Sequence, residues 1–138
     1  MNKCVFCKIV KNEIPTDKIY EDEKFFAFLD INPVNPGHIL VVPKNHYENI
    51  YSLPDEILCD IGSVIKKIAV AVKKSVNADG INIIMNNDRA AGQIVPHAHF
   101  HIIPRFSNDG LRHWSGKPYS NKEEAAKIAE KIKKELGL

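Results

Sequence analysis

Short apolar segments rich in β-branched and aromatic residues predict five β-strands along the chain. KIYEDE and FFAFLDI are joined by an acidic turn, and HILVVP follows a loop that the prolines and glycine of NPVNPG enforce. GINIIMN and HAHFHII come later, the second bounded by Pro96 and Pro104. We therefore expect strands over 18–23, 25–31, 38–43, 80–86 and 97–103.

A helical period replaces this pattern between residues 53 and 76. Pro54 suits a first helical turn, and NADG ends the segment. The predicted inward face comprises Ile57, Leu58, Ile61, Val64, Ile65, Ile68 and Val72.

A second helical pattern begins at Ser120, which forms a predicted capping box with Glu123, and stops at Gly137. Its predicted inward residues are Ala125, Ile128, Ala129 and Ile132.

The succession of these elements favours an α+β fold in a single domain, residues 1–138. Most strands follow one another as in hairpins and only one helical crossover occurs, which favours a mainly antiparallel sheet of about five strands. The long central helix and a C-terminal helix accompany this sheet. With 138 residues and 44% hydrophobic content, the chain can bury one core.

Charge and hydropathy limit the kinds of molecule that this protein can bind. The 19 basic and 17 acidic residues nearly balance, so we expect no nucleic-acid surface, although a small anionic ligand would fit. The longest aliphatic run, residues 39–42, is far shorter than a spanning helix needs, and we see no cleavable leader. We expect a soluble, cytoplasmic protein without membrane partners.

Three cysteines in a chain that we expect to be cytoplasmic argue against a disulfide framework, and their odd number supports this. Cys59 lies in the long helical pattern, where we expect a small buried hydrophobic residue. Cys4 and Cys7 form a C-x-x-C pair, which by ligand type and spacing is half of a zinc site. The alternatives are a redox dithiol, which normally opens a helix of a βαβ unit that this N-terminus lacks, or two unused thiols.

Three histidines alternate in HAHFHII, so a strand would place His97, His99 and His101 on one face and Ala98, Phe100 and Ile102 in the core. This pattern fits three interpretations. A polar face that merely contains histidines is the simplest. A metal cage is disfavoured because three ligands on one strand lie almost in a line. Nucleophilic catalysis at phosphorus would use one neutral imidazole in a fixed tautomer, with hydrogen-bond donors for the phosphate oxygens.

HAHFHII resembles the His-x-His-x-His motif of the histidine triad (HIT) superfamily. The resemblance extends over nearly the whole chain, through CKIVKNEIPTDKIYEDEKFFAFLDINPVNPGHILVVPKNH, NIIMNN, AGQIVPHAHFHIIPR and a late HW. The chain is most similar to the Hint-type branch. This resemblance implies a HIT-like fold and cleavage of the phosphorus–nitrogen bond of purine nucleoside 5′-phosphoramidates through a nucleotidyl-histidine, with no organic cofactor.

The resemblance also implies roles for individual residues. His99 would attack phosphorus, His97 would hold the array in register, His101 would donate to the phosphate, and His38 would lie nearby. Asp30 would accept hydrogen bonds from the ribose hydroxyls. The base would occupy an apolar slot of Phe6, Ile9, Phe28, Ile31 and Leu40. Phosphate would be bound by Asn86 and by the loop amides near Gly92, Gln93 and Val95.

Relatives with the same C-x-x-C imply that a structural zinc ion is bound by Cys4, Cys7, His46 and His97. The resemblance further implies a homodimer, for which we expect the apolar face of the 53–76 helix to offer surface. Many relatives place a hydroxyl residue where this chain has Ile94, so a side-chain contact to phosphate is absent there. Dinucleoside polyphosphate hydrolysis, nucleotidyl transfer and a non-enzymatic nucleotide-binding adaptor remain alternatives.

Overall fold

Residues 3–138, which the computed structural model describes, form five strands, three α-helices and two short 3-10 helices. Their bounds, in chain order, are α1 (Val5–Val10), β1 (Lys18–Glu21), β2 (Phe25–Leu29), β3 (Ile39–Pro43), η1 (Ile50–Ser52), α2 (Asp55–Ser75), β4 (Gly80–Ile84), η2 (Arg89–Ala91), β5 (Phe100–Arg105) and α3 (Lys122–Glu135).

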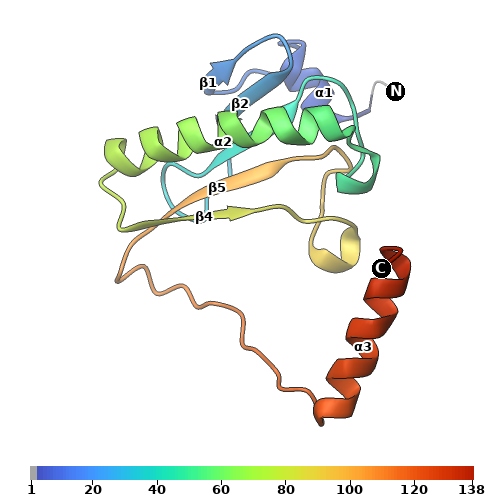
Figure 1. Ribbon diagram of the computed structural model, residues 1–138. Coiled ribbons are helices and arrows are strands. Elements are labelled where there is room, and N and C mark those ends of the chain that lie inside the picture. Colours follow the sequence, from blue (N-terminus) through green and yellow to red (C-terminus); the bar gives the residue numbers. More distant parts are fainter. Residues whose placement is uncertain (1–2) are drawn as a thin grey trace.

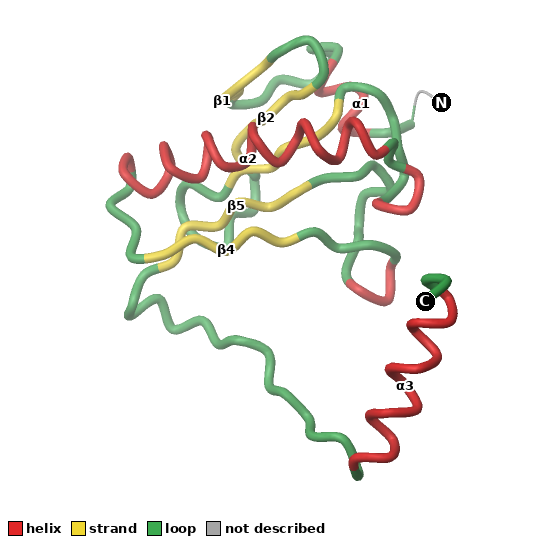
Figure 2. The backbone as a smooth tube through the Cα atoms, in the orientation of Figure 1, coloured by secondary structure: helices red, strands yellow, loops and turns green. Residues whose placement is uncertain are grey.

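The strands make one sheet in the order β1-β2-β3-β5-β4, and every neighbouring pair is antiparallel (Figures 1 and 2). The long connection through α2 places β4 outside β5, where it forms one edge of the sheet. The predicted α+β fold with a five-stranded antiparallel sheet is therefore confirmed.

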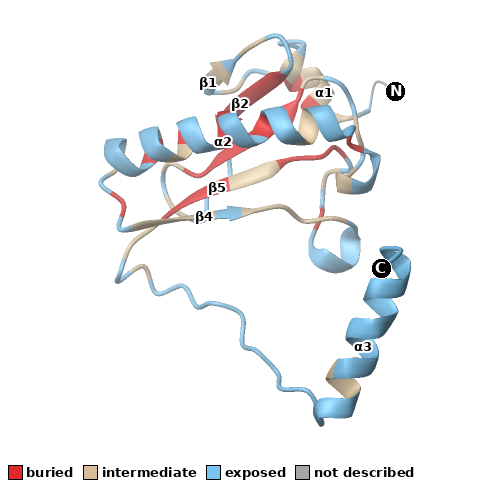
Figure 3. Ribbon diagram, viewed as in Figure 1, coloured by how far each residue is buried: buried red, intermediate tan, exposed pale blue. Residues whose placement is uncertain are grey.

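Apolar side chains pack on both faces of the sheet, and its strands β2 and β3 are almost wholly buried (Figure 3). Alternate side chains of β2, β3 and β5, such as Phe25, Val41 and Ile102, pack under α2. The opposite set, including Phe28 and Leu40, packs under α1 through Phe6. Because the strands alternate, α1 and α2 must cover opposite faces.

Helix α2 buries the predicted face. Ile61, Val64, Ile65, Ile68 and Val72 are buried against the sheet, and Ile57 and Leu58 are half-buried. The helix ends lie one or two residues inside the predicted range, because Pro54 is the N-cap rather than a first-turn residue.

Cys59 contradicts its prediction, because its side chain is exposed. It follows Ile57 and Leu58 directly, and two consecutive apolar positions already turn toward the sheet there. The next residue in a helix is rotated onward to the solvent side.

Strand β5 begins three residues later than predicted and continues through Pro104. The proline does not break the ladder to β4, where it lies opposite Ile81. Its carbonyl accepts a hydrogen bond from Asn35 on the β3 side, so its nitrogen also points to that side. Strand β3 begins only at Ile39, opposite Ile102, so the missing N–H costs no ladder bond.

Helix α3 stands away from the sheet at the end of an extended segment (Figure 1). The predicted inward face is wrong for the single chain, since Ile128 and Ile132 are 38% and 56% exposed. The predicted cap is displaced by one residue, because Asn121 accepts from the amide of Glu124 and is the N-cap. Within residues 3–138, no helix is long and apolar enough to cross a membrane.

Candidate active site and metal centre

The three alternating histidines lie on the α1 side of the sheet. His97 and His99 are buried and His101 is half-buried. The ring of Phe6, carried by α1, meets the ring of His99 edge-on at 5.1 Å. The predicted shared face is confirmed, but α1 covers part of it, so the imidazoles are mostly shielded from solvent rather than on an open surface.

Hydrogen bonding fixes the tautomer of His99. Its Nδ1 lies 2.7 Å from the carbonyl oxygen of His97, and a carbonyl can only accept, so Nδ1 carries the proton. The lone pair is therefore on Nε2. Burial lowers the pKa of His99, which favours the neutral ring. A neutral imidazole with a free Nε2 is the form that can act as a nucleophile.

His38 and His101 form a second fixed array. The backbone N–H of Val34 donates to Nδ1 of His38 at 3.0 Å, so the proton of His38 is on Nε2. That Nε2 lies 2.9 Å from Nδ1 of His101, which must then accept. His101 consequently carries its own proton on Nε2 and presents a donor beside His99, whose ring is 5.0 Å away.

Asp30 directly follows β2, which ends at Leu29. Its Oδ1 accepts from the amide of Asn32 at 2.8 Å, and its Oδ2 lies 3.7 Å from Nε2 of His38. The side chain is 19% exposed, so the second oxygen can still accept from a ligand.

Four of the five residues predicted for the base slot form one cluster. Phe6, Ile9, Phe28 and Leu40 are all buried together, as ordinary core residues would be. Ile31 is outside the cluster and 89% exposed.

The predicted phosphate loop is held by one buried glutamine. The side chain of Gln93 donates to the carbonyls of Glu48 and Val95 and accepts from the amide of Asp88. Its side-chain groups are therefore occupied. The backbone N–H of Gln93 also donates to the carbonyl of Asp88 at 3.1 Å, and that of Gly92 donates to the carbonyl of Arg89 at 3.0 Å. Gly92 has φ of 92°, which favours glycine, and a Cβ there would lie 3.7 Å from Nδ2 of Asn86, at ordinary contact distance.

Cys4, Cys7, His46 and His97 come together as the resemblance implied. Nδ1 of His97 lies 3.4 Å from Sγ of Cys4 and 3.5 Å from Sγ of Cys7, and Nδ1 of His46 lies 3.4 Å from Sγ of Cys7. Zinc–sulfur and zinc–nitrogen bonds at tetrahedral angles would separate sulfur from nitrogen by about 3.6 Å. Nε2 of His97 donates to the carbonyl of Pro43, which leaves Nδ1 free to bind a metal. The donor set and its geometry fit zinc.

The C-x-x-C pair also opens a helix, contrary to expectation. Cys4 is the N-cap of α1, and its sulfur accepts from the amide of Cys7. No βαβ unit follows, because β1 and β2 are antiparallel, so the surroundings differ from those of a redox dithiol.

A second group of metal-binding residue types, Asp30, His38 and His101, is explained without an ion. A cation on Nε2 of His38 would force the ring proton onto Nδ1, where it would face the N–H of Val34. Two donors would then oppose each other. The hydrogen-bonded array is the arrangement that satisfies these atoms.

Sequence reasoning missed the backbone amide of Val34, which determines the tautomer of His38. A backbone donor leaves no mark in side-chain types. The only signal in the sequence is the position of Val34 between Pro33 and Pro36, which indicates a loop of restricted conformation.

Comparison with known proteins shows which class this fold and site belong to. The HIT domain model matches residues 11–108, more than half of the chain. The chain therefore belongs to the HIT family.

Individual relatives cover almost all of the chain. It is 39% identical over 138 residues to adenosine 5′-monophosphoramidase HNT1 of Candida albicans, which covers 96% of this chain and 91% of the relative. The crystal structure of SMU.412c from Streptococcus mutans matches with a TM-score of 0.93 and 43% identity, over 99% of this chain and 87% of that one. A zinc-bound histidine triad family protein from Mycobacterium smegmatis matches with a TM-score of 0.76 and 38% identity, over 98% and 96% of the two chains.

Proposed function

We propose that this protein is a nucleotide hydrolase that cleaves the phosphorus–nitrogen bond of purine nucleoside 5′-phosphoramidates through a nucleotidyl intermediate on His99. The observation that carries the proposal is the bond from Nδ1 of His99 to the carbonyl of His97, which leaves a neutral Nε2 free. The Candida relative, named an adenosine 5′-monophosphoramidase, supports the substrate class.

The proposed reaction has two displacements at phosphorus. Nε2 of His99 attacks the α-phosphorus, the phosphorus–nitrogen bond breaks, and the departing nitrogen takes up a proton and leaves as the amine. Water then attacks the same phosphorus and releases His99. Over both steps one water is consumed: its OH group ends on the nucleoside monophosphate, and its other proton replaces the one that the amine took up. The carbonyl of His97 stabilises the positive charge that the attacking ring acquires.

The surrounding residues bind the substrate in this proposal. His101 donates from Nε2 to a phosphate oxygen, and Asn86 and the backbone amide of Val95 hold the others. Asp30 accepts from the ribose hydroxyls. The base contacts the apolar cluster at Phe6.

A trapping experiment tests the reaction. Wild-type protein, incubated with an adenosine phosphoramidate and quenched in mild base, should carry a nucleotidyl group on residue 99 by mass spectrometry. His99→Ala should lose turnover at least about 100-fold while keeping nucleotide affinity, because only the nucleophile is removed. His113→Ala removes an exposed histidine and is the matched control.

The result also separates the alternatives. Substantial turnover by His99→Ala would contradict the assignment of His99 as the nucleophile. Dinucleoside polyphosphate hydrolysis or nucleotidyl transfer would use the same adduct with another leaving group or acceptor, and a binding module would give no turnover by wild type.

We propose in addition that Cys4, Cys7, His46 and His97 hold a structural zinc ion. Two thiolates and two imidazoles would make a closed tetrahedral site. The ion would supply no chemistry to substrate. It would tie α1 to the histidine segment, which keeps Phe6 against the ring of His99.

A homodimer is the third proposal. The reason given from the sequence is wrong, because the apolar face of α2 is covered by its own sheet. Exposed apolar residues elsewhere support pairing instead: Ile83 on edge strand β4 is 52% exposed, and Ile128 and Ile132 on α3 are 38% and 56% exposed. Closed two-fold pairing is the commonest way to bury such surfaces.

A further inference from the structure

We infer that the loop of residues 32–37 sets the tautomers of His38 and His101 through the N–H of Val34, and that Asn35 and Asp109 are positioning residues that hold this loop. The role in catalysis rests on the proposed function. The placement of protons rests on the hydrogen bonds alone.

The first step is the direction of one hydrogen bond. A backbone N–H can only donate, so the 3.0 Å contact from Val34 requires a lone pair on Nδ1 of His38. A neutral His38 then has its proton on Nε2. Burial lowers the pKa of His38, which favours that neutral ring.

In the second step, the tautomer of His38 determines the tautomer of His101 on the neighbouring strand. His38 precedes β3 and lies diagonally from His101 on β5, because Ile39 is opposite Ile102. The donor on Nε2 of His38 meets Nδ1 of His101 at 2.9 Å. His101 is left with its N–H on Nε2, on a ring whose centroid lies 5.0 Å from that of His99. With the opposite tautomers, His101 would present a lone pair to a phosphate oxygen, which repels it.

The third step is the anchoring of the loop. Nδ2 of Asn35 donates to the carbonyl of Pro104 at 2.9 Å and to Oδ2 of Asp109 at 3.1 Å. Gly37 adopts φ of 99°, and a Cβ there would lie 3.1 Å from the side chain of Val76. The loop is therefore held against β5 at one point by Asn35 and passes close to the end of α2 at another.

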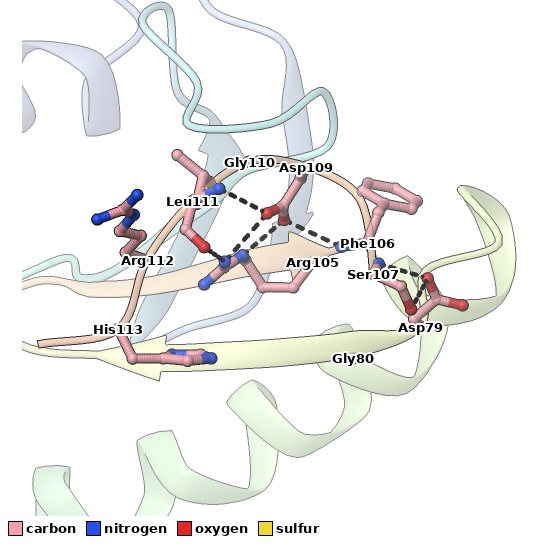
Figure 4. A pocket seen from close by; sticks show the side chains of 10 residues that line it. All are labelled: Asp79, Gly80, Arg105, Phe106, Ser107, Asp109, Gly110, Leu111, Arg112 and His113. Carbon is pink, nitrogen blue, oxygen red and sulfur yellow. Dashed lines mark hydrogen bonds and ion pairs between the residues drawn. The ribbon is translucent and has the colours of Figure 1, made fainter.

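Asp109 is itself rigidly placed (Figure 4). Its carboxylate receives two bonds from the guanidinium of Arg105, at 2.7 and 3.1 Å, and two more from the amides of Phe106 and Leu111. These contacts line an open groove of ≈ 650 Å³ at the end of β4 and β5 away from His101. The groove thus contains the anchor of the loop. It lies at the opposite end of β5 from His101.

Imidazole ¹⁵N NMR measures the tautomers directly, without substrate. In wild-type protein we expect His38 and His101 to carry the proton on Nε2 and His99 to carry it on Nδ1. Val34→Pro deletes the donor, and Val34→Ala is its matched control because it keeps the N–H. Asn35→Ala releases the loop, and Asn82→Ala is its control because it removes another partner of Arg105 without touching the loop.

We expect Val34→Pro and Asn35→Ala to give mixed tautomers at His38 and His101 and to lower kcat for adenosine phosphoramidate by about fivefold, the scale of one hydrogen bond. KM should change little, because the ribose and base contacts remain. Val34→Ala and Asn82→Ala should match wild type in both measurements.

Wild-type tautomers in both Val34→Pro and Asn35→Ala would overturn the inference, as would a proton on Nδ1 of His101 in wild type. If Val34→Pro does not fold, Asn35→Ala decides. A wild-type protein with the expected tautomers but without turnover would support the proton placement and overturn the proposed function instead.

Discussion

Asp30 offers the sharpest quantitative test of nucleotide binding, through the substitution Asp30→Ala. One carboxylate oxygen is already used, because Oδ1 accepts from the amide of Asn32 at 2.8 Å. The other, Oδ2, lies 3.7 Å from Nε2 of His38. The substitution removes the only acceptor that we assign to the ribose, together with the small contact inside the loop.

The expected loss of binding free energy for AMP follows from the hydrogen bonds lost and from the exposure of the Asp30 side chain. A hydrogen bond to a charged group contributes about 1.5 to 3 kcal/mol. The side chain is 19% exposed, so water competes for it and the effect should lie in the range of about 1 to 3 kcal/mol. This corresponds to a dissociation constant for AMP that rises about 5- to 150-fold.

Isothermal titration calorimetry with AMP and with its 2′,3′-dideoxy analogue completes a thermodynamic cycle. Wild type and Asp30→Ala should bind the dideoxy analogue about equally, since neither can form the bonds in question. Asp30→Asn keeps an oxygen for the amide of Asn32 and should also lose affinity for AMP, which separates ribose binding from loop geometry. If the effects of mutation and missing hydroxyls simply add, Asp30 does not contact the ribose and the reasoning is refuted.

The other predictions concern the metal, the oligomer and pH. The double substitution Cys4→Ser with Cys7→Ser should lower the zinc content from near one ion per chain to none and lower the midpoint temperature of unfolding. Cys59→Ser should change neither quantity. A wild-type protein that holds no metal and is fully stable would contradict the zinc site. Sedimentation at micromolar concentration should show a dimer that Ile128→Asp with Ile132→Asp converts to monomer, and a monomeric wild type would exclude it. Burial and the neighbouring imidazoles lower the pKa of His101 to about 4, below about 6.5 for an unfolded histidine. The unfolded chain therefore takes up the proton first, and unfolding free energy is lost as pH falls from about 6.5 toward 4. His101→Gln should lessen that loss by about 1 to 3 kcal/mol at pH 4.5 in urea titrations, and an unchanged pH dependence would show that His101 is not buried in its neutral form.

The sequence by itself determined which residues share a face. Strand alternation placed His99 and His101 together, and helical spacing identified the face of α2 that includes Ile61 and Ile65. Both patterns are local: they depend on the backbone geometry of a few consecutive residues, so one chain segment is enough to read them. The zinc ligands and the roles at the site came instead from the family resemblance.

What covers each face was decided only by the tertiary structure. Ile128 and Ile132 show the helical spacing of a buried stripe, yet both are exposed in the single chain. Pro104 fits within β5 because β3 starts too late to need its missing N–H. In each case the outcome depends on a neighbour that the local sequence does not contain.

The proton positions at the site belong to the same category. The neutral Nε2 of His99 and the N–H of His101 depend on a backbone carbonyl and a backbone amide, which every residue possesses and which no residue pattern singles out. The metal site joins Cys4 to His97, 93 positions apart. Such contacts depend on how distant elements pack against each other, and that packing is settled by the free energy of the whole fold rather than by any one segment.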